Sequence, residues 1–276
     1  MLQPSRLLIT QTVMAQIEAY NEDTIVALWT EILDTQQALG YYPVPDAIVK
    51  APPGGHVINE ELCAKLKLSP AVISLMKRLA YLRDYDIARD FPIFDGSVAI
   101  PYICDDQILP ARDPHNRFAS DDEINVDFML PTEIALVVSL GKGLHLILDT
   151  AANTIRLYDY MDGPPSPEGD KDTRERPDDP DHYRNYPPVS APVALKDIIA
   201  KFKSLTWIPK RYSDSWGNSG GVVMECQSNA SSFVKDALIK NYGWPENFRR
   251  EQWIEDQERI WWESENQYNP DREDIP

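Results

Sequence analysis

The sequence predicts an α+β protein in which a mostly antiparallel sheet is flanked by helices. Three observations lead to this fold class. Apolar residues follow helical spacing near the start of the chain, apolar or alternating runs with short turns occupy residues 134–160, and helical spacing returns after residue 194. Consecutive strands joined by short turns pair as an antiparallel meander. Hydrophobic residues make up 43% of the 276 residues, enough to bury a sizeable core.

Residues 1–90 are expected to form a helical region packed on the core. Apolar residues spaced as on one face of a helix predict its first helix. These residues are Ile25, Leu28, Trp29, Ile32 and Leu33. Asn59 is a favoured cap for a short second helix. Ser69 followed by Pro70 is typical of a further helix start, because serine accepts a backbone hydrogen bond and proline fits the first helical position.

Residues 91–245 are expected to form the α+β core. Its strands are predicted over residues 134–140, 144–148 and 154–160, and its helices over residues 194–203 and 228–240. Gly141-Lys142-Gly143 is interpreted as a hairpin turn. A phosphate loop would need a Lys-Ser or Lys-Thr pair and a following helix, whereas a strand follows here.

The net charge of −17 is spread unevenly along the chain. Residues 157–190 hold nine acids, four bases and seven prolines, so we expect an acidic, proline-rich surface insertion over residues 161–190. After the break at Gly243-Trp244-Pro245, residues 246–276 are expected to form an acidic helix and tail. Residues 191–250 instead hold nine bases and five acids, which predicts a mildly basic face.

Several classes of protein are disfavoured. No run approaches the roughly twenty apolar residues of a membrane helix, and residues 1–16 lack the apolar segment of a signal peptide. We therefore expect a cytoplasmic protein with no membrane contact. The three cysteines are far apart and the four histidines show no metal-ligand spacing, so we expect neither a metal site nor a cofactor.

An acidic strip between residues 105 and 127 is a candidate site. Asp105, Asp106 and Asp113 are interpreted as ligands for a cation, above all a guanidinium, whose N–H groups match the two oxygens of a carboxylate. His115 lies among these acids and is a candidate general base. A solvated acidic face that aids solubility explains the same pattern.

Basic and aromatic residues interleave in the C-terminal third. Lys201, Lys203, Lys210 and Arg211 are candidates for contact with a nucleic-acid backbone, and Trp216 is a candidate for lining a substrate site. Two observations oppose this interpretation. The whole chain is acidic and repels polyanions, and exposed cations beside core aromatics would give the same sequence.

Three segments carry a family resemblance. Residues 52–56, 73–81 and 242–248 resemble a large group of uncharacterised fungal proteins. Between them, residues 143–157 and 193–202 resemble the strand–strand–helix core of the SUKH superfamily, which is widespread in fungi and in bacterial toxin-immunity systems. This resemblance implies a SUKH-like fold, with a mostly antiparallel sheet flanked by helices, and an interaction module as one function.

Fungal proteins of this kind also include arginine-containing cyclodipeptide synthases, which take aminoacyl groups from tRNA. In that hypothesis the acidic strip binds the arginine substrate with Trp216, His115 is the base, and the four cations hold the acceptor end of an aminoacyl-tRNA. Two alternatives stay open. One is a non-catalytic SUKH-like module that binds a protein partner, and the other is a cofactor-free biosynthetic enzyme acting on a small molecule.

Overall fold

The computed structural model describes residues 18–94, 96–141, 143–159, 163–166, 172–213 and 219–268. Trp216, the N-terminal segment considered for a signal peptide, and parts of the acidic insertion and tail lie outside these residues. The predicted fold class is confirmed, because helices flank antiparallel sheets throughout the described chain.

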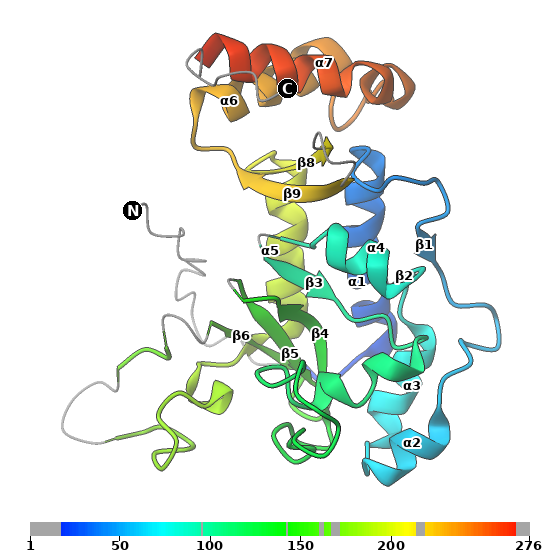
Figure 1. Ribbon diagram of the computed structural model, residues 1–276, viewed down its shortest axis with the longest axis vertical. Coiled ribbons are helices and arrows are strands. Elements are labelled where there is room, and N and C mark those ends of the chain that lie inside the picture. The colour runs from blue at the N-terminus through cyan, green and yellow to red at the C-terminus, as the bar shows by residue number, and fades with distance from the viewer. Residues whose placement is uncertain are drawn as a thin grey trace.

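A five-stranded antiparallel sheet forms the centre of the molecule (Figure 1). Its spatial order is β3 (Ser97–Ala99), β4 (Glu133–Ser139), β5 (His145–Asp149), β6 (Thr154–Tyr158) and β7 (Val189–Ser190). The meander predicted over residues 134–160 is confirmed as β4, β5 and β6. Pairs such as Leu146 with Leu157 fix the register of β5 against β6. The short edge strands β3 and β7 were not predicted.

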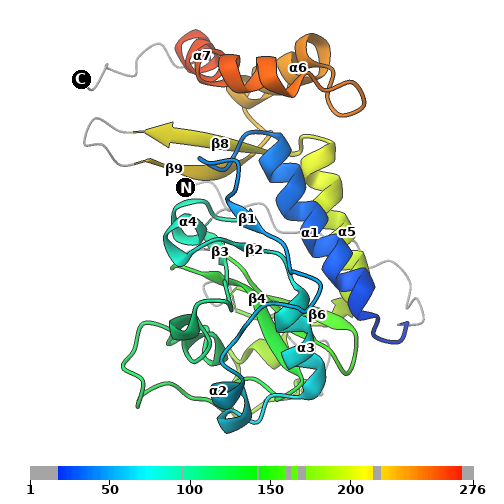
Figure 2. The same cartoon turned by 90° about the vertical axis from the view of Figure 1, so that its right-hand side faces the viewer.

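Both faces of this sheet are buried, but by different kinds of structure. Helices α1 (Glu22–Ala38) and α5 (Ala191–Lys203) lie side by side, and α5 packs on β6 and β7 (Figure 2). The other face is covered largely by irregular chain between β3 and β4, which contains the short 3₁₀ helices η1 (Asp105–Gln107) and η2 (Pro110–Arg112). All seven residues of β4 are buried, as a doubly covered strand requires.

The predicted helix starts near the N-terminus are confirmed. The Asn59 side chain accepts a hydrogen bond from the backbone N–H of Leu62 (3.0 Å) at the start of α2 (Glu60–Lys65). The Ser69 hydroxyl accepts from the N–H of Val72 (3.3 Å) at the start of α3 (Pro70–Arg78). This region also contains β1 (Ile48–Val49), β2 (Tyr81–Leu82) and α4 (Tyr85–Asp90). The apolar residues of α1, α2 and α3 join the same core as the sheet.

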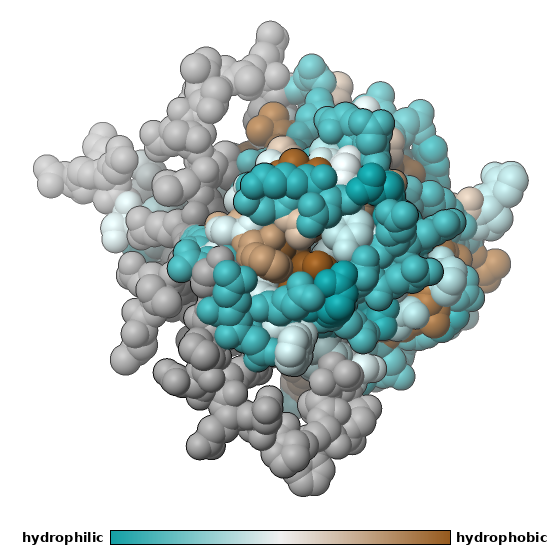
Figure 3. Space-filling view, turned by 90° about the horizontal axis from the view of Figure 1, so that it is seen from above, coloured by the Kyte–Doolittle hydropathy of each residue, from teal (hydrophilic) through white to brown (hydrophobic). Residues whose placement is uncertain are grey.

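A second, smaller apolar cluster lies at the other end of the molecule. It joins the hairpin of β8 (Trp207–Ser213) and β9 (Ser219–Glu225) to α6 (Asn229–Tyr242) and α7 (Arg250–Tyr268). Trp253 is almost fully buried, and its indole N–H donates to the carbonyl of Leu39 (2.7 Å), just after α1. Seen from this end, the surface is mostly hydrophilic with small apolar areas (Figure 3).

The end of the predicted surface insertion is instead part of the core. Tyr183, in the 3₁₀ helix η3 (Tyr183–Asn185), is fully buried, and its hydroxyl donates to the carboxylate of Glu133. The Arg156 guanidinium donates to the carbonyls of Arg184 and Tyr186. Net charge and proline content predict an exposed segment. This prediction is wrong for the end of the segment, because the rings of Tyr183 and Tyr186 pack against Tyr158 of the sheet.

A substitution at Gly221 tests how closely β9 packs against the main core. A Cβ added at Gly221 would lie 2.2 Å from Cε2 of Tyr41, whose ring is buried. Gly221→Ala should therefore lower the free energy of unfolding by about 1–3 kcal/mol, as overpacked sites do. Gly54→Ala is the matched control, because a Cβ there meets nothing within 4 Å. Urea unfolding followed by tryptophan fluorescence measures both. Equal stability of the two variants would contradict the packing.

Candidate functional site

The structure separates the three predicted guanidinium ligands by their burial. Asp105 and Asp106 are exposed in η1, and each accepts a side-chain amide hydrogen bond. Asp113 is fully buried. Its carboxylate accepts from Nδ2 of Asn116 (3.1 Å) and from the N–H of Asn125 (3.0 Å). Asp113 therefore closes its own loop, and its carboxylate is not presented to a ligand.

The acidic strip instead surrounds two arginines of its own. Arg112 is buried, and its guanidinium donates to the carbonyls of Met129, Leu130 and Glu133. Arg117 is also buried, and Nη2 donates to Oε1 of Gln107 (2.9 Å). The Gln107 amide in turn donates to Asp106 (3.1 Å). Neither arginine was predicted to be part of the site, although both lie within the strip.

His115 lies on the surface of the same loop, whereas His145, at the start of β5, is buried. The ring of His145 stacks on Tyr158 with centroids 5.0 Å apart. Burial, together with the nearby charges of His115 and Arg117, lowers the pKa of His145 to about 3. His145 is therefore neutral in the folded protein at ordinary pH.

The carboxylate of Glu133 and the phenol of Tyr183 are both buried, and they meet at the start of strand β4. Glu133 accepts from the Tyr183 hydroxyl and from the N–H of Leu130 (2.7 Å), and burial raises its pKa. His182 and Phe128 pack against Tyr183, with ring centroids 4.6 and 5.1 Å from it. In the ranges that the structure describes, no group of histidine, cysteine or acidic residues has the arrangement to hold a metal ion.

The four predicted tRNA-binding cations are all engaged by carboxylates of the same chain. Lys201 pairs with Asp197 (3.0 Å), and its ammonium lies 4.7 Å from the ring centroid of Trp207. The remaining pairs are Lys203 with Glu31, Lys210 with Glu265, and Arg211 with Glu258. Two of these carboxylates come from the acidic helix α7. The basic face counted in the sequence is thus largely neutralised by the fold.

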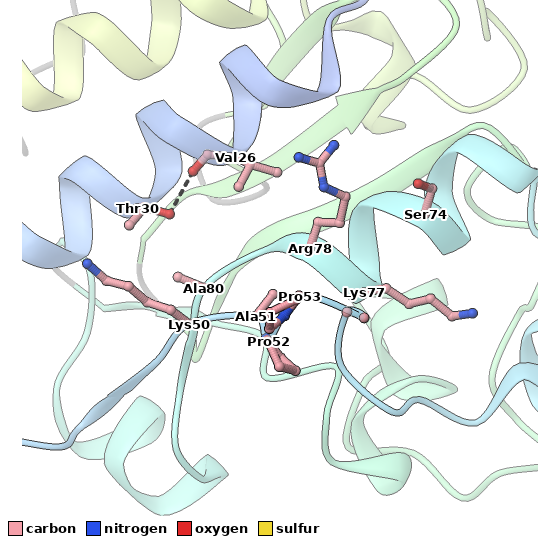
Figure 4. A pocket seen from close by; sticks show the side chains of 12 residues that line it. Val26, Thr30, Lys50, Ala51, Pro52, Pro53, Ser74, Lys77, Arg78 and Ala80 are labelled. Atoms are coloured by element: carbon pink, nitrogen blue, oxygen red, sulfur yellow. Dashed lines mark hydrogen bonds between the residues drawn. The ribbon is translucent and has the colours of Figure 1, made fainter.

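A first surface hollow of about 560 Å³ opens between α1, α3 and the turn at residues 51–55 (Figure 4). Figure 4 shows Val26 and Thr30 on the α1 wall and Arg78 with Ser74 on α3. The charged residues of its lining are all cations: Lys50, Lys77 and Arg78. Their carboxylate partners, among them Asp34 and Glu60, lie outside this lining.

The turn that forms the floor of this hollow is fixed to the end of α3. The N–H of Gly55 donates to the carbonyl of Pro52 (2.8 Å), and the N–H of His56 donates to the carbonyl of Lys77 (2.8 Å). Gly55 has φ +80°, and a Cβ there would lie 3.1 Å from Cβ of Lys77. Glycine is required at this position by both the backbone angle and the close approach.

A second hollow of about 540 Å³ continues along α1. The α1 residues Ala27, Thr35 and Ala38 form one wall, and Trp244 with Phe248 form the other. The Phe248 ring meets that of Trp244 edge to face, with centroids 4.9 Å apart. Glu31, Asp34 and Lys203 also line this mainly apolar hollow. Glu31 pairs with Lys203, and Asp34 pairs with Lys50.

The two hollows are neighbours along α1, because Thr30 lines both. The sequence segments 52–56 and 73–81 contribute to the first hollow, and 242–248 contributes to the second. The three segments that carry the resemblance to fungal proteins thus all lie beside α1. This site could not be predicted from the sequence, because the hollows form only when α1 packs against turns that are distant in sequence.

No family model, curated protein or solved structure matches the chain. Across the described residues, no helix is long and apolar enough to cross a membrane.

The buried His145 predicts a pH dependence of stability. Its ordinary pKa of 6.5 applies to the unfolded chain, so between pH 6.5 and about 3 only the unfolded chain binds this proton. The free energy of unfolding should fall as pH falls through this window, by up to about 1.4 kcal/mol per pH unit from this group. Urea unfolding at a series of pH values measures the slope. His145→Gln should reduce it, while His115→Gln should keep most of it. An unchanged slope in His145→Gln would contradict the assignment.

Proposed function

We propose that this protein is a non-catalytic binding module that holds a segment of a protein partner along α1. The observation that carries the proposal is the pair of hollows joined at Thr30. Two neighbouring hollows along one helix fit an extended segment better than a compact small molecule. The two hollows differ in chemistry, so one segment with two kinds of side chain would fill both.

The first hollow favours acidic side chains in the partner. Lys50, Lys77 and Arg78 line it. The pairs of Lys50 with Asp34 and of Lys77 with Glu60 are partly exposed and contribute little stability, whereas Arg78 is held by both Glu22 and Asp23. A carboxylate of the partner can replace Asp34 or Glu60 at small cost. The second hollow favours a large apolar side chain against Trp244 and Phe248, because aromatic anchors supply most of the binding energy in small interfaces.

The position of one predicted substrate ligand supports this choice. Asp113 is buried and bonded within its own loop, so its carboxylate is not available to a guanidinium. The cyclodipeptide synthase and the cofactor-free enzyme stay predictions that no observation tests, as does the SUKH-like resemblance. In the synthase hypothesis, Asp105 and Asp106 stay accessible for a guanidinium and His115 for a proton.

A substitution in the middle of the surface tests the proposal. Ala27 is exposed on α1 and lines the second hollow, so Ala27→Glu adds bulk and negative charge there without touching the core. Random peptides of about twelve residues, displayed on phage, are selected on the wild-type protein. The enriched peptides should carry acidic residues and one aromatic or large aliphatic residue. Ala27→Glu should weaken their binding at least about tenfold.

Ala200→Glu is the matched control, because Ala200 is an exposed alanine on helix α5 and lines neither hollow. It should bind the selected peptides as the wild type does. Equal binding by both variants, or no enrichment at all, would contradict the docking surface. A new arginine-containing cyclic dipeptide in a yeast host expressing the protein, seen by mass spectrometry against an empty vector, would favour the synthase instead.

A further inference from the structure

Arg117 is a buried cation with an incomplete set of hydrogen bonds. Only 6% of the residue is exposed, and the hydrogen bond from Nη2 to Gln107 uses one of its three nitrogens. Neither Nε nor Nη1 has a hydrogen-bond partner among the described residues. A buried charge without full compensation costs several kcal/mol, so proteins rarely keep one without a use.

Arg112, five residues earlier, shows what a purely structural arginine looks like in this loop. Both of its Nη atoms donate to backbone carbonyls, three in all, and they tie the loop to β4. Among the described residues only its Nε lacks a partner, whereas Arg117 lacks one at both Nε and Nη1. Arg117 makes no such contacts with the backbone in the described part of the chain. The difference cannot arise from depth, because Arg112 and Arg117 are almost equally buried.

Two aromatic rings lie close to the Arg117 guanidinium. The rings of Tyr85 and Phe118 each lie 5.2 Å from its central carbon. Such cation–π contacts compensate part of the charge, but they give the N–H groups of Nε and Nη1 no acceptor oxygen. Phe118 is 73% exposed, so it lies at the surface.

The charges that act near Arg117 are of both signs. Besides burial, the charges of His115 and Arg117 both act on His145 and lower its pKa. Asp106 acts on Arg117, but its carboxylate is exposed and is bonded to the Gln107 amide. In a chain with a net charge of −17, a buried arginine that donates to a neutral amide is a local exception.

We propose that Arg117 holds a small oxyanion, the carboxylate or phosphate group of a ligand, beneath Phe118. Nε and Nη1 together supply three N–H donors, and guanidinium groups bind both oxyanions through charge-assisted hydrogen bonds. The acidic strip was expected to bind a cationic ligand. In this proposal it surrounds the cation Arg117 of the protein itself, and Arg117 binds an anion. The site is separate from the α1 surface and does not depend on the proposed function.

An NMR titration of the full chain tests the site. Sodium phosphate and sodium acetate are added in separate arms, each against sodium chloride at equal ionic strength, and the arginine Nε–H signals are followed. The Arg117 signal should shift and saturate, whereas the Arg112 signal should stay in place. The arm that saturates at lower concentration identifies the phosphate or the carboxylate group.

Arg117→Gln assigns the signal and should abolish the saturating shift. This variant removes a buried side chain and can lose the fold. The wild-type titration, with the Arg112 signal as internal reference, therefore tests the site without it. A second readout is the thermal midpoint, which should rise with the binding anion and not with chloride. Equal shifts at Arg112 and Arg117, or no shift beyond that in chloride, would overturn the site.

Discussion

One face of the central sheet depends on the guanidinium of Arg112. That face is covered by irregular chain, and irregular chain cannot satisfy its own carbonyls as a helix does. Arg112 donates to the carbonyls of Met129, Leu130 and Glu133, and so replaces the missing backbone donors. Glu133 is fixed further by the Tyr183 hydroxyl, which brings the end of the proline-rich segment onto the same face. The loop between β3 and β4 can then bury polar groups at modest cost.

The net charge of the chain decides how its surface cations are paired. Acids outnumber bases by seventeen, so a cation on the surface readily finds a carboxylate. Lys210 and Arg211 are paired with Glu265 and Glu258 of α7, residues that lie far away in sequence. Surface pairs of this kind contribute little stability, so a ligand of opposite charge can displace them. Lys50 in the first hollow is paired in the same way, with Asp34 at 2.7 Å.

Periodicity and capping residues predicted the elements whose stability is mostly local. The meander of β4 to β6 and the caps at Asn59 and Ser69 are examples. The hairpin of β8 and β9 was missed because Pro209 and the pair Gly220-Gly221 argue against strands when considered alone. The structure explains them by close approach, since Gly221 lies against the buried ring of Tyr41. Of the candidate sites, the acidic strip was visible in the sequence, but its two buried arginines could not be paired without the fold.

Helix α1 connects the two apolar clusters to the proposed docking surface. Its inner residues, such as Ile32 and Leu33, belong to the main core, while Leu39, just beyond its end, belongs to the second cluster. Its outer residues line both hollows. A partner held between the turn at residues 51–55 and the turn at residues 244–248 therefore contacts structures attached to each cluster. Because a ligand that binds only the native arrangement stabilises it, docking would resist separation of the two clusters as well as unfolding of either one. The same helix thus supplies the core contact and one wall of the proposed docking surface, so recognition there would be inseparable from the packing that holds the molecule together.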